Sequence, residues 1–281
     1  GGDAGVIRVH GSKKAVASTV DSSASYCYAH PLTGGKQVVC ENWRNLISVG
    51  ANPAAITNCL NFGNPENEKN MGEFVECVEG ITEASKFLNL PVVSGNVSFY
   101  NETKNKGIKP TPVIGGVGVL SDYKQILSMN LKNIGNLVLV IGKTEGHLEQ
   151  SIFAKEIISE KKGPPPEINF FNEKNNGETI LKLIEKNLIV SCHDISLGGI
   201  LTSVSKMCIK GNKGIRINPL KSLINKFQYF FGEDQGRYII ELNKKNLDSV
   251  KKILNQNSVY FDYLGIVNDN KITFNNDINL S

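Results

Sequence analysis

The stretch Pro-Val-Val-Ser-Gly-Asn-Val-Ser-Phe-Tyr-Asn-Glu, residues 91–102, runs from an apolar strand into a polar loop. Val92-Val93 is typical of the end of a buried strand, and Gly95 lets the backbone turn tightly or approach a ligand closely. The loop then carries Asn96, Ser98 and Glu102. Their amide, hydroxyl and carboxylate groups suit a phosphate and a hard cation such as magnesium. The alternative is a plain polar turn between two strands.

A second junction of the same type lies nearer the N-terminus. The apolar run Ala54-Ala55-Ile56 leads into Thr57-Asn58-Cys59-Leu60-Asn61-Phe62-Gly63-Asn64-Pro65-Glu66, a polar loop punctuated by glycine and proline. Both strand ends carry Asn and Glu, and one carries Ser. We therefore expect them to converge on one site for a phosphate and a metal ion.

Length and composition describe an ordinary globular protein. A chain of 281 residues, 40% hydrophobic and 21% charged, is long enough for two modest domains or one large domain. No apolar run approaches the length of a membrane span, and the N-terminus lacks a secretory signal. We therefore expect a cytoplasmic protein with no membrane partner.

Charge and cysteine content argue against further classes of function. The net charge of +4 is spread along the chain, without a basic stripe and interleaved stacking aromatics, so nucleic-acid binding is not indicated. The six cysteines show no Cys-x-x-Cys pairing and no accompanying His spacing. The sequence therefore favours free thiols over zinc sites or disulfides.

Apolar runs of strand length alternate with helical segments along the chain, which predicts an α/β fold built in layers. A polar connector at 121–135 separates two such units. We place the first domain at residues 1–125 and the second at residues 126–281. The segment 22–31 is predicted to be a loop, and a helix is predicted over 179–186.

Carboxylates at two other strand ends are candidates for the same chemistry. The second predicted strand ends at Asp21, which is either a magnesium or nucleotide contact or a turn residue. A later buried strand ends in His193-Asp194-Ile195-Ser196-Leu197-Gly198-Gly199, which opens a helix. There His193 or Asp194 faces a ligand cleft, or Asp194 or Ser196 caps the helix.

The motifs Leu60-Asn-Phe-Gly-Asn-Pro-Glu66 and Ser94-Gly-Asn-Val-Ser-Phe-Tyr-Asn-Glu102 together resemble the synthetase subunit of phosphoribosylformylglycinamidine synthase, in particular the second of its two homologous halves. Further similar segments occur in the same order along the chain: Gly34-Gly35-Lys36, Gly163–Pro166, the run that starts at His193 and the loop at Glu233. Several separate motifs in one order make a specific signal, and they span nearly the whole chain.

The resemblance implies a fold and an activity. The fold is a first α/β unit whose strands form half of a barrel shared with a partner, followed by a second α/β unit of the aminoimidazole ribonucleotide synthetase type. The activity is that of an ATP-dependent, amidine-forming ligase of purine biosynthesis. ATP phosphorylates the amide oxygen of formylglycinamide ribonucleotide, and ammonia from glutamine then displaces phosphate to give formylglycinamidine ribonucleotide, with Mg²⁺ as the second cofactor.

Matched residue by residue, the resemblance assigns ATP contacts to Asn58 and Gly95, a magnesium ligand to Asn96 and a substrate contact to Ser98. It assigns no catalytic residue, because the family's catalytic histidine lies in the other half. We therefore expect this chain to be inactive until joined to the missing N-terminal half. A glutaminase subunit and a small ammonia-channel subunit are further implied partners, and we expect a homodimer when the chain is isolated, since exposed barrel strands associate.

Two other interpretations stay open. The chain is a scaffolding half, or one that keeps a structural nucleotide. Alternatively it is a complete sister enzyme, such as aminoimidazole ribonucleotide synthetase, selenophosphate synthetase or thiamine-phosphate kinase. The two quoted motifs argue against this last interpretation.

Overall fold

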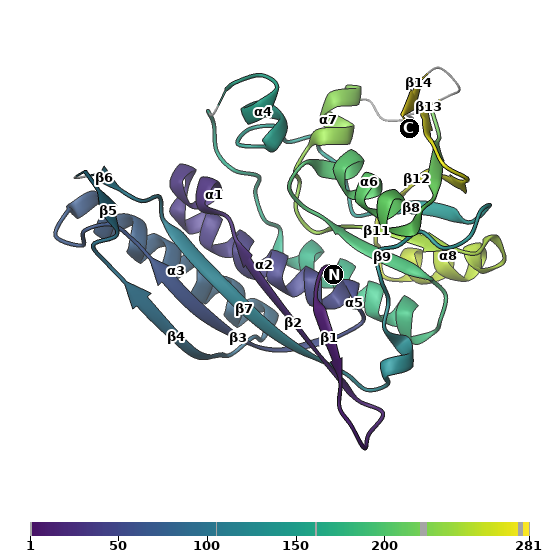
Figure 1. Ribbon diagram of the computed structural model, residues 1–281, viewed down its shortest axis with the longest axis horizontal. Coiled ribbons are helices and arrows are strands. Elements are labelled where there is room, and N and C mark those ends of the chain that lie inside the picture. The colour runs from purple at the N-terminus through teal and green to yellow at the C-terminus, as the bar shows by residue number, and fades with distance from the viewer. Residues whose placement is uncertain (1, 105, 161, 220–223, 275–277, 281) are drawn as a thin grey trace.

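A computed structural model describes residues 2–104, 106–160, 162–219, 224–274 and 278–280 (Figure 1). It has two large β-sheets, each covered by helices, and helix α2 (Pro31–Ser48) lies where the two units meet. α2 packs on the first sheet and also contacts strand β9 (Ser191–Ile195) and helix α5 (Phe170–Glu185) of the second unit. The predicted layered α/β fold is confirmed.

The first sheet has five strands in the order β1 (Gly5–Arg8), β2 (Ala15–Ser22), β7 (Thr111–Leu120), β3 (Asn52–Asn61) and β4 (Val92–Ser98). β3 and β4 run parallel, and the other three pairs are antiparallel. Helices α2 and α3 (Glu68–Leu88) pack on one face, and the short helix α1 (Ala24–Ala29) packs on α2. A small hairpin of β5 (Glu102–Thr103) and β6 (Lys106–Gly107) follows β4.

The second sheet has seven strands, listed here in spatial order: β14 (Ile278–Leu280), β13 (Ile272–Phe274), β10 (Gly214–Ile217), β12 (Phe261–Asn268), β8 (Leu137–Ile141), β11 (Arg237–Leu242) and β9. Helices α5 and α8 (Leu247–Gln256) pack on one face, and α6 (Gly199–Gly211) and α7 (Lys226–Phe231) pack on the other. Shorter elements connect these parts: α4 (Ile152–Glu156) and the 3₁₀ turns at Tyr123–Gln125 and Lys244–Asn246.

Strand β8 explains why the second sheet needs helices on both faces. Its residues are apolar without interruption, as expected for a strand buried on both sides. Leu139 and Ile141 join the apolar core with α5 and α8. Val138 and Val140 join the separate core under α6 and α7. The side-chain period of two therefore divides one apolar run between two cores.

Glycines let α2 and α3 approach closely. A Cβ on Gly35 of α2 would collide with the carbonyl oxygen of Cys77, and a Cβ on Gly80 of α3 would collide with that of Leu32. The two helices therefore meet backbone to backbone. This contact holds α2 against the first sheet.

Two local predictions were wrong. The predicted loop at 22–31 contains α1 and the start of α2, because tertiary packing buries Tyr26 and Cys27 in a segment too short to show a helical period. α5 begins at Phe170, nine residues before the predicted helix, where three Asn and one Gly weaken the helix signal and the Asn169 side chain caps the first turn. The domain boundary at residues 125 and 126 stays a prediction. Within the described ranges, no helix has the length and apolar character needed to cross a membrane.

The glycine contact predicts a difference between two substitutions in the same helix. Gly80→Ala should destabilise the chain by about 1–3 kcal/mol, because the new methyl group must push α3 away from α2. Gly72→Ala meets open space, so it should be neutral or stabilise by up to about 1 kcal/mol through higher helix propensity. Urea denaturation of both variants measures this, and equal effects would contradict the proposed close packing.

Candidate metal and nucleotide site

One turn of α2 lies between a carboxylate of the first sheet and a carboxylate of the second. On the first side, Asn42 Nδ2 donates to Asp21 Oδ2 at 3.1 Å and Asn45 Nδ2 donates to Asp21 Oδ1 at 2.9 Å. On the second side, Arg44 Nε lies 3.8 Å from Asp194 Oδ2. Residues far apart in the sequence therefore meet around this turn. Asp21 lies inside β2 and not in a turn, so the turn interpretation is wrong.

Glu41 adds a third carboxyl group to the same place, and all three hold protons more tightly than usual. Burial and the charge of Glu41 raise the pKa of Asp21 to about 7. Burial and the charge of Asp194 raise the pKa of Glu41. Burial, with the charge of nearby Asp3, raises the pKa of Asp194. The three groups therefore repel one another, and a cation among them would relieve that repulsion.

Arg44 is the buried positive charge beside these carboxylates. Its side chain is fully buried, and Nη1 donates to Glu173 Oε1 at 2.7 Å while Nη2 donates to Gln235 Oε1 at 3.1 Å. Burial works against its charge, but Glu173, Asp194 and Glu41 raise its pKa above the usual value. Every one of these contacts except Glu41 belongs to the second unit, so Arg44 ties α2 to that unit.

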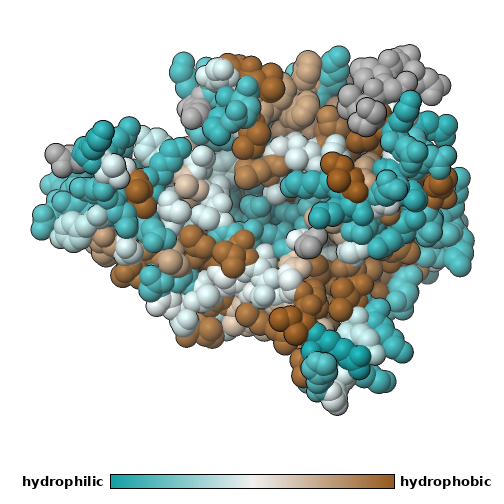
Figure 2. Space-filling view, in the orientation of Figure 1, coloured by the Kyte–Doolittle hydropathy of each residue, from teal (hydrophilic) through white to brown (hydrophobic). Residues whose placement is uncertain are grey.

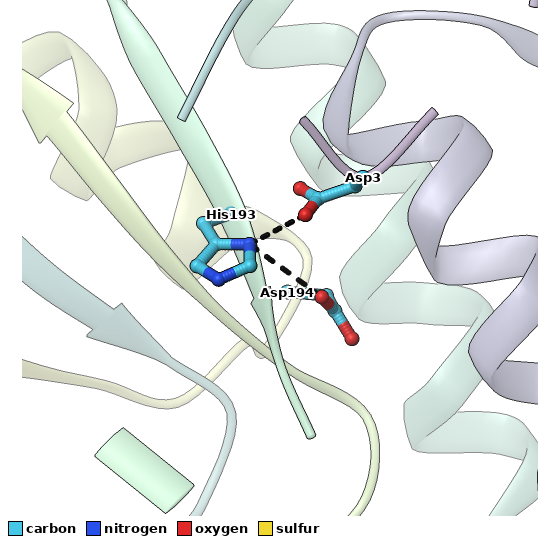
Figure 3. A group of neighbouring side chains, drawn as sticks. All are labelled: Asp3, His193 and Asp194. Atoms are coloured by element: carbon cyan, nitrogen blue, oxygen red, sulfur yellow. Dashed lines mark ion pairs between the residues drawn. The ribbon is translucent and has the colours of Figure 1, made fainter. Parts of the chain in front are cut away.

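His193 and Asp194 lie side by side on β9, with Asp3 of the N-terminal segment facing them (Figure 3). His193 Nδ1 is 2.6 Å from Asp3 Oδ1 and 3.6 Å from Asp194 Oδ1. Burial lowers the pKa of His193, but the hydrogen bond and charge of Asp3 outweigh it and the net shift is upward. Within the described residues, one donor atom from each of these three side chains lies within 4.8 Å of the others.

The capping interpretation of the His193 run is wrong. α6 begins after Gly198, a left-handed residue that caps the helix without a side-chain bond. Asp194 instead lies in β9, which continues to Ile195, and it faces Arg44. The structure thus places Asp194 and Asp21 together at α2 and leaves His193 paired with Asp3.

The strand-end asparagines fall in two groups. Backbone pairing places Asp21, Ile114, Asn58 and Gly95 in one row across β2, β7, β3 and β4. This row faces the helices, and a Cβ on Gly95 would collide with the side-chain oxygen of Asn58. Glycine at position 95 therefore leaves room for that amide.

Asn96 and Ser98 lie on the opposite face of the same strand pair. They align with Cys59 and Asn61 of β3, one and three residues beyond the row that faces the helices. Ser98 Oγ donates to Asn101 Oδ1 at 3.3 Å. The structure therefore brings Asn58 and Gly95 together, and it separates their side of the sheet from Asn96 and Ser98. The ligand roles of these four residues stay predictions.

Sequence reasoning missed Glu41 and Arg44, and it named the loop at Glu233 without assigning Glu233 a contact. Glu233 Oε1 accepts from the backbone N–H groups of Ile152 and Gly198 at 2.8 Å each, and Glu233 Oε2 accepts from the hydroxyl of Tyr26. Glu41 and Arg44 occupy positions next to buried apolar residues of α2, such as Trp43 and Leu46. The available signal was that apolar residues occur both before and after this charged pair, from Val38 to Ile47.

Family models match almost the whole chain. The model described as "AIR synthase related protein, N-terminal domain" matches residues 1–120, and "AIR synthase related protein, C-terminal domain" matches residues 133–274. The chain therefore belongs to the family of AIR synthase related proteins, and the two-unit architecture is that of this family.

Two relatives of the chain are PurL subunits. The chain is 67% identical over 281 residues to "Phosphoribosylformylglycinamidine synthase subunit PurL" of Pelagibacter ubique (strain HTCC1062), covering 100% of this chain and 38% of that protein. It is 46% identical over 250 residues to the PurL subunit of Nitrobacter hamburgensis, covering 89% of this chain and 34% of that protein. The chain thus spans little more than a third of the length of these relatives. The resemblance predicted from the motifs is confirmed.

A solved structure agrees in fold. "T. maritima PurL complexed with FGAR" aligns with a TM-score of 0.81 over 100% of this chain and 46% of that chain, at 20% sequence identity. At 20% identity, this similarity shows that the two chains share a fold and nothing more.

The pairing of Arg44 predicts a large effect on stability. Arg44→Met should cost about 3–5 kcal/mol, because Glu173 and Asp194 would stay buried without their partner. Lys36→Met is the matched control on the same helix: it removes a partly exposed ion pair with Glu83 and should cost at most about 1 kcal/mol. Fluorescence of Trp43, the one tryptophan, follows urea unfolding of both variants. Similar losses of stability in the two variants would contradict the proposal that Arg44 ties α2 to the second unit.

Proposed function

We propose that this chain is part of an ATP-dependent ligase of the PurL type, working in the cytoplasm, that converts formylglycinamide ribonucleotide, ammonia and ATP to formylglycinamidine ribonucleotide. The chain supplies part of the nucleotide, magnesium and substrate site, as the second half of such an enzyme. The observation that carries the proposal is the group of three mutually repelling carboxyl groups around α2. The identity to PurL subunits supports the choice of reaction.

In this proposal Asp21, Glu41 and Asp194 attract Mg²⁺ to the turn of α2, and Asp194 also belongs to the group Asp3, His193 and Asp194, whose ligand atoms lie within 4.8 Å of one another. Carboxylate oxygens are the ligands that this ion prefers, and the raised pKa values of the three groups fit a place meant for a cation. When bound, Mg²⁺ neutralises negative charge on the nucleotide phosphates. Asn42 and Asn45 orient the Asp21 carboxylate through their amide groups, while Arg44 holds the side of the site that Asp194 provides.

The four matched residues then have roles on two faces of the sheet. Asn58 and Gly95 contact ATP on the helix side, in the row that also contains Asp21. Asn96, as a magnesium ligand, and Ser98, as a substrate contact, lie on the outer face, so Asn96 would hold an ion separate from the one at the carboxylates. A ligand on that face needs a second wall, which the missing half of the enzyme would provide. The active site is therefore composite.

The outer face of the first sheet has the apolar character expected of a surface that a partner covers. Exposed valines lie on it in adjacent strands: Val16 and Val20 of β2, and Val117 and Val119 of β7. Figure 2 shows hydrophobic residues gathered along the lower part of the view, over this sheet. We infer that the missing half covers this face as a shared barrel, and that a second copy covers it when the chain is alone. A glutaminase subunit and a small ammonia-channel subunit complete the proposed assembly; one related solved structure is titled "Structure of PurLQS from Thermotoga maritima".

The second candidate function is that of a half that keeps a structural nucleotide. It is favoured by the burial of Asp194, since a closed site exchanges ligands slowly. In that case ATP or ADP would co-purify with the chain and would not turn over. The sister-enzyme alternative requires turnover of an aminoimidazole-type or related substrate by this chain alone.

The proposed site predicts magnesium-dependent nucleotide binding. Asp21→Asn or Asp194→Asn should weaken ATP binding in the presence of Mg²⁺ by about tenfold or more, because each removes a charged ligand of the cation. Asp122→Asn, a partly exposed aspartate that caps a 3₁₀ turn, is the control and should leave affinity unchanged. Calorimetric titration measures this. Adding the missing half as a separate chain should then give formylglycinamidine ribonucleotide formation, and turnover without it would exclude the half-enzyme proposal.

The exposed sheet face predicts self-association. Val20→Lys/Val117→Lys should shift the isolated chain from dimer to monomer in sedimentation, because two charges would be buried in the shared face. Ile209→Lys, a similar change at an exposed apolar residue on α6, should leave the dimer intact. A wild-type chain that sediments as a monomer would contradict the proposed pairing.

A further inference from the structure

A cleft of about 800 Å³ lies within the second unit, where the end of β8 and the start of α5 face the loop that precedes β11. Five carboxylates and one lysine are among its described lining residues: Glu145, Glu149, Glu167, Glu173, Asp234 and Lys143. The lysine is already paired, since its Nζ lies 2.8 Å from Glu145 Oε1. The described side chains therefore give the cleft a net negative charge, which disfavours an anionic ligand.

Three consecutive backbone N–H groups converge on the Asp234 carboxylate. Oδ2 accepts from Glu145 at 3.1 Å and from Gly146 at 2.9 Å, and Oδ1 accepts from His147 at 3.0 Å. Successive N–H groups that converge in this way form a nest, a backbone arrangement that binds phosphate and other anions. In this chain the anion in the nest is one of its own side chains.

A glycine and a buried cation favour an anion at this position. Gly146 has a φ of 84°, a left-handed conformation that suits glycine, and a Cβ there would lie 2.6 Å from the Cβ of Gln228. Arg237 Nη1 lies 3.7 Å from Asp234 Oδ2, and the Arg237 side chain is fully buried. The same Nη1 donates to Thr144 Oγ1 at 3.0 Å, directly before the nest. The nest therefore combines shaped backbone donors with a guanidinium group.

The loop that forms the nest also has contacts that do not involve the Asp234 side chain. The backbone N–H of Glu233 donates to the carbonyl of His147 at 2.9 Å. A ring nitrogen of His147 lies 3.0 Å from the carbonyl oxygen of Pro164. We therefore expect the three N–H groups to stay together when the carboxylate is removed.

We propose that residues 145–147 form an anion-binding loop that Asp234 occupies, and that Asp234 thereby closes the cleft of the second unit to phosphate-bearing ligands. A tethered carboxylate has a high effective concentration at the nest, so a free anion cannot readily displace it. A ligand of this cleft is therefore neutral or cationic where it meets the loop. Asp21, Glu41 and Asp194 are not among the described lining residues, so the inference holds whether or not the chain binds ATP.

Removing the side chain should open the loop to a free anion. In Asp234→Ala, sulfate and inorganic phosphate should bind saturably and at least about tenfold more tightly than to the wild-type chain, because three N–H groups lose their charged acceptor. Calorimetry in a buffer without divalent ions measures the affinity. The backbone amide NMR signals of Glu145, Gly146 and His147 locate the anion. They should shift on titration in the variant and stay unchanged in the wild type. The same shifts in the wild-type chain would overturn the proposal.

Two further variants separate the nest from general effects of salt. Asp234→Ser also shortens the side chain, and it should bind sulfate as Asp234→Ala does. Asp122→Ala is the control, since this partly exposed carboxylate accepts from one backbone N–H, that of Lys124 at 2.9 Å, and its removal should create no anion site.

Thermal unfolding gives a readout that holds even for a variant that is unfolded without an anion. Sulfate stabilises most proteins, so each variant is compared with the wild type and with chloride at equal ionic strength. Millimolar sulfate should raise the melting temperature of the Asp234 variants, or refold them, beyond its effect on the wild type and on Asp122→Ala. Equal responses in all four proteins, or Asp234 variants that neither bind sulfate nor gain stability from it, would refute the proposed anion-binding loop.

Discussion

The structure depends on the pairing of one buried charge, that of Arg44. A guanidinium group without exposed surface is stable only when other groups satisfy it, and its partners Glu173 and Asp194 both belong to the second unit. Trp43, the preceding residue, packs against α5 where a Cβ on Gly177 would collide with its ring. Charge pairing and steric fit therefore act on the same turn of α2, and together they set the two sheets in position around it.

This arrangement couples the candidate site to the packing of the two units. Asp21 comes from the first sheet and Asp194 from the second, and both approach the α2 turn that carries Glu41 and Arg44. Three carboxyl groups against one guanidinium leave an excess of negative charge in a poorly solvated place. A cation that relieved this repulsion would bind the folded chain far better than the unfolded chain, so it would stabilise the contact between the units as well.

The sequence predicts those features that depend on local pattern. Asp21 and Asp194 stood out because each is a carboxylate at the end of a predicted strand. Glu41 and Arg44 did not, because a polar residue on a helix is ordinarily solvated. Only the packing of α5 and β9, more than a hundred residues later, buries Arg44. The start of α5 was also missed. Capping by Asn169 and the pairing of Glu173 with Arg44 stabilise the first turns of this helix, and helix propensity does not.

Strand β4 carries matched residues on both faces of the sheet. Successive residues of a strand lie on opposite faces of the sheet. Gly95 and Asn96 are neighbours in one motif, but they therefore serve opposite faces. A motif of this kind can serve a single ligand only if that ligand passes the end of the strand, or it serves two ligands on two faces. α2 and α3 cover the helix-facing side of β3, whereas β4 itself is exposed and the other side of the sheet carries exposed valines. A ligand on the open side would lack a second wall within the described residues, and the partner that covers the valines is in position to provide it.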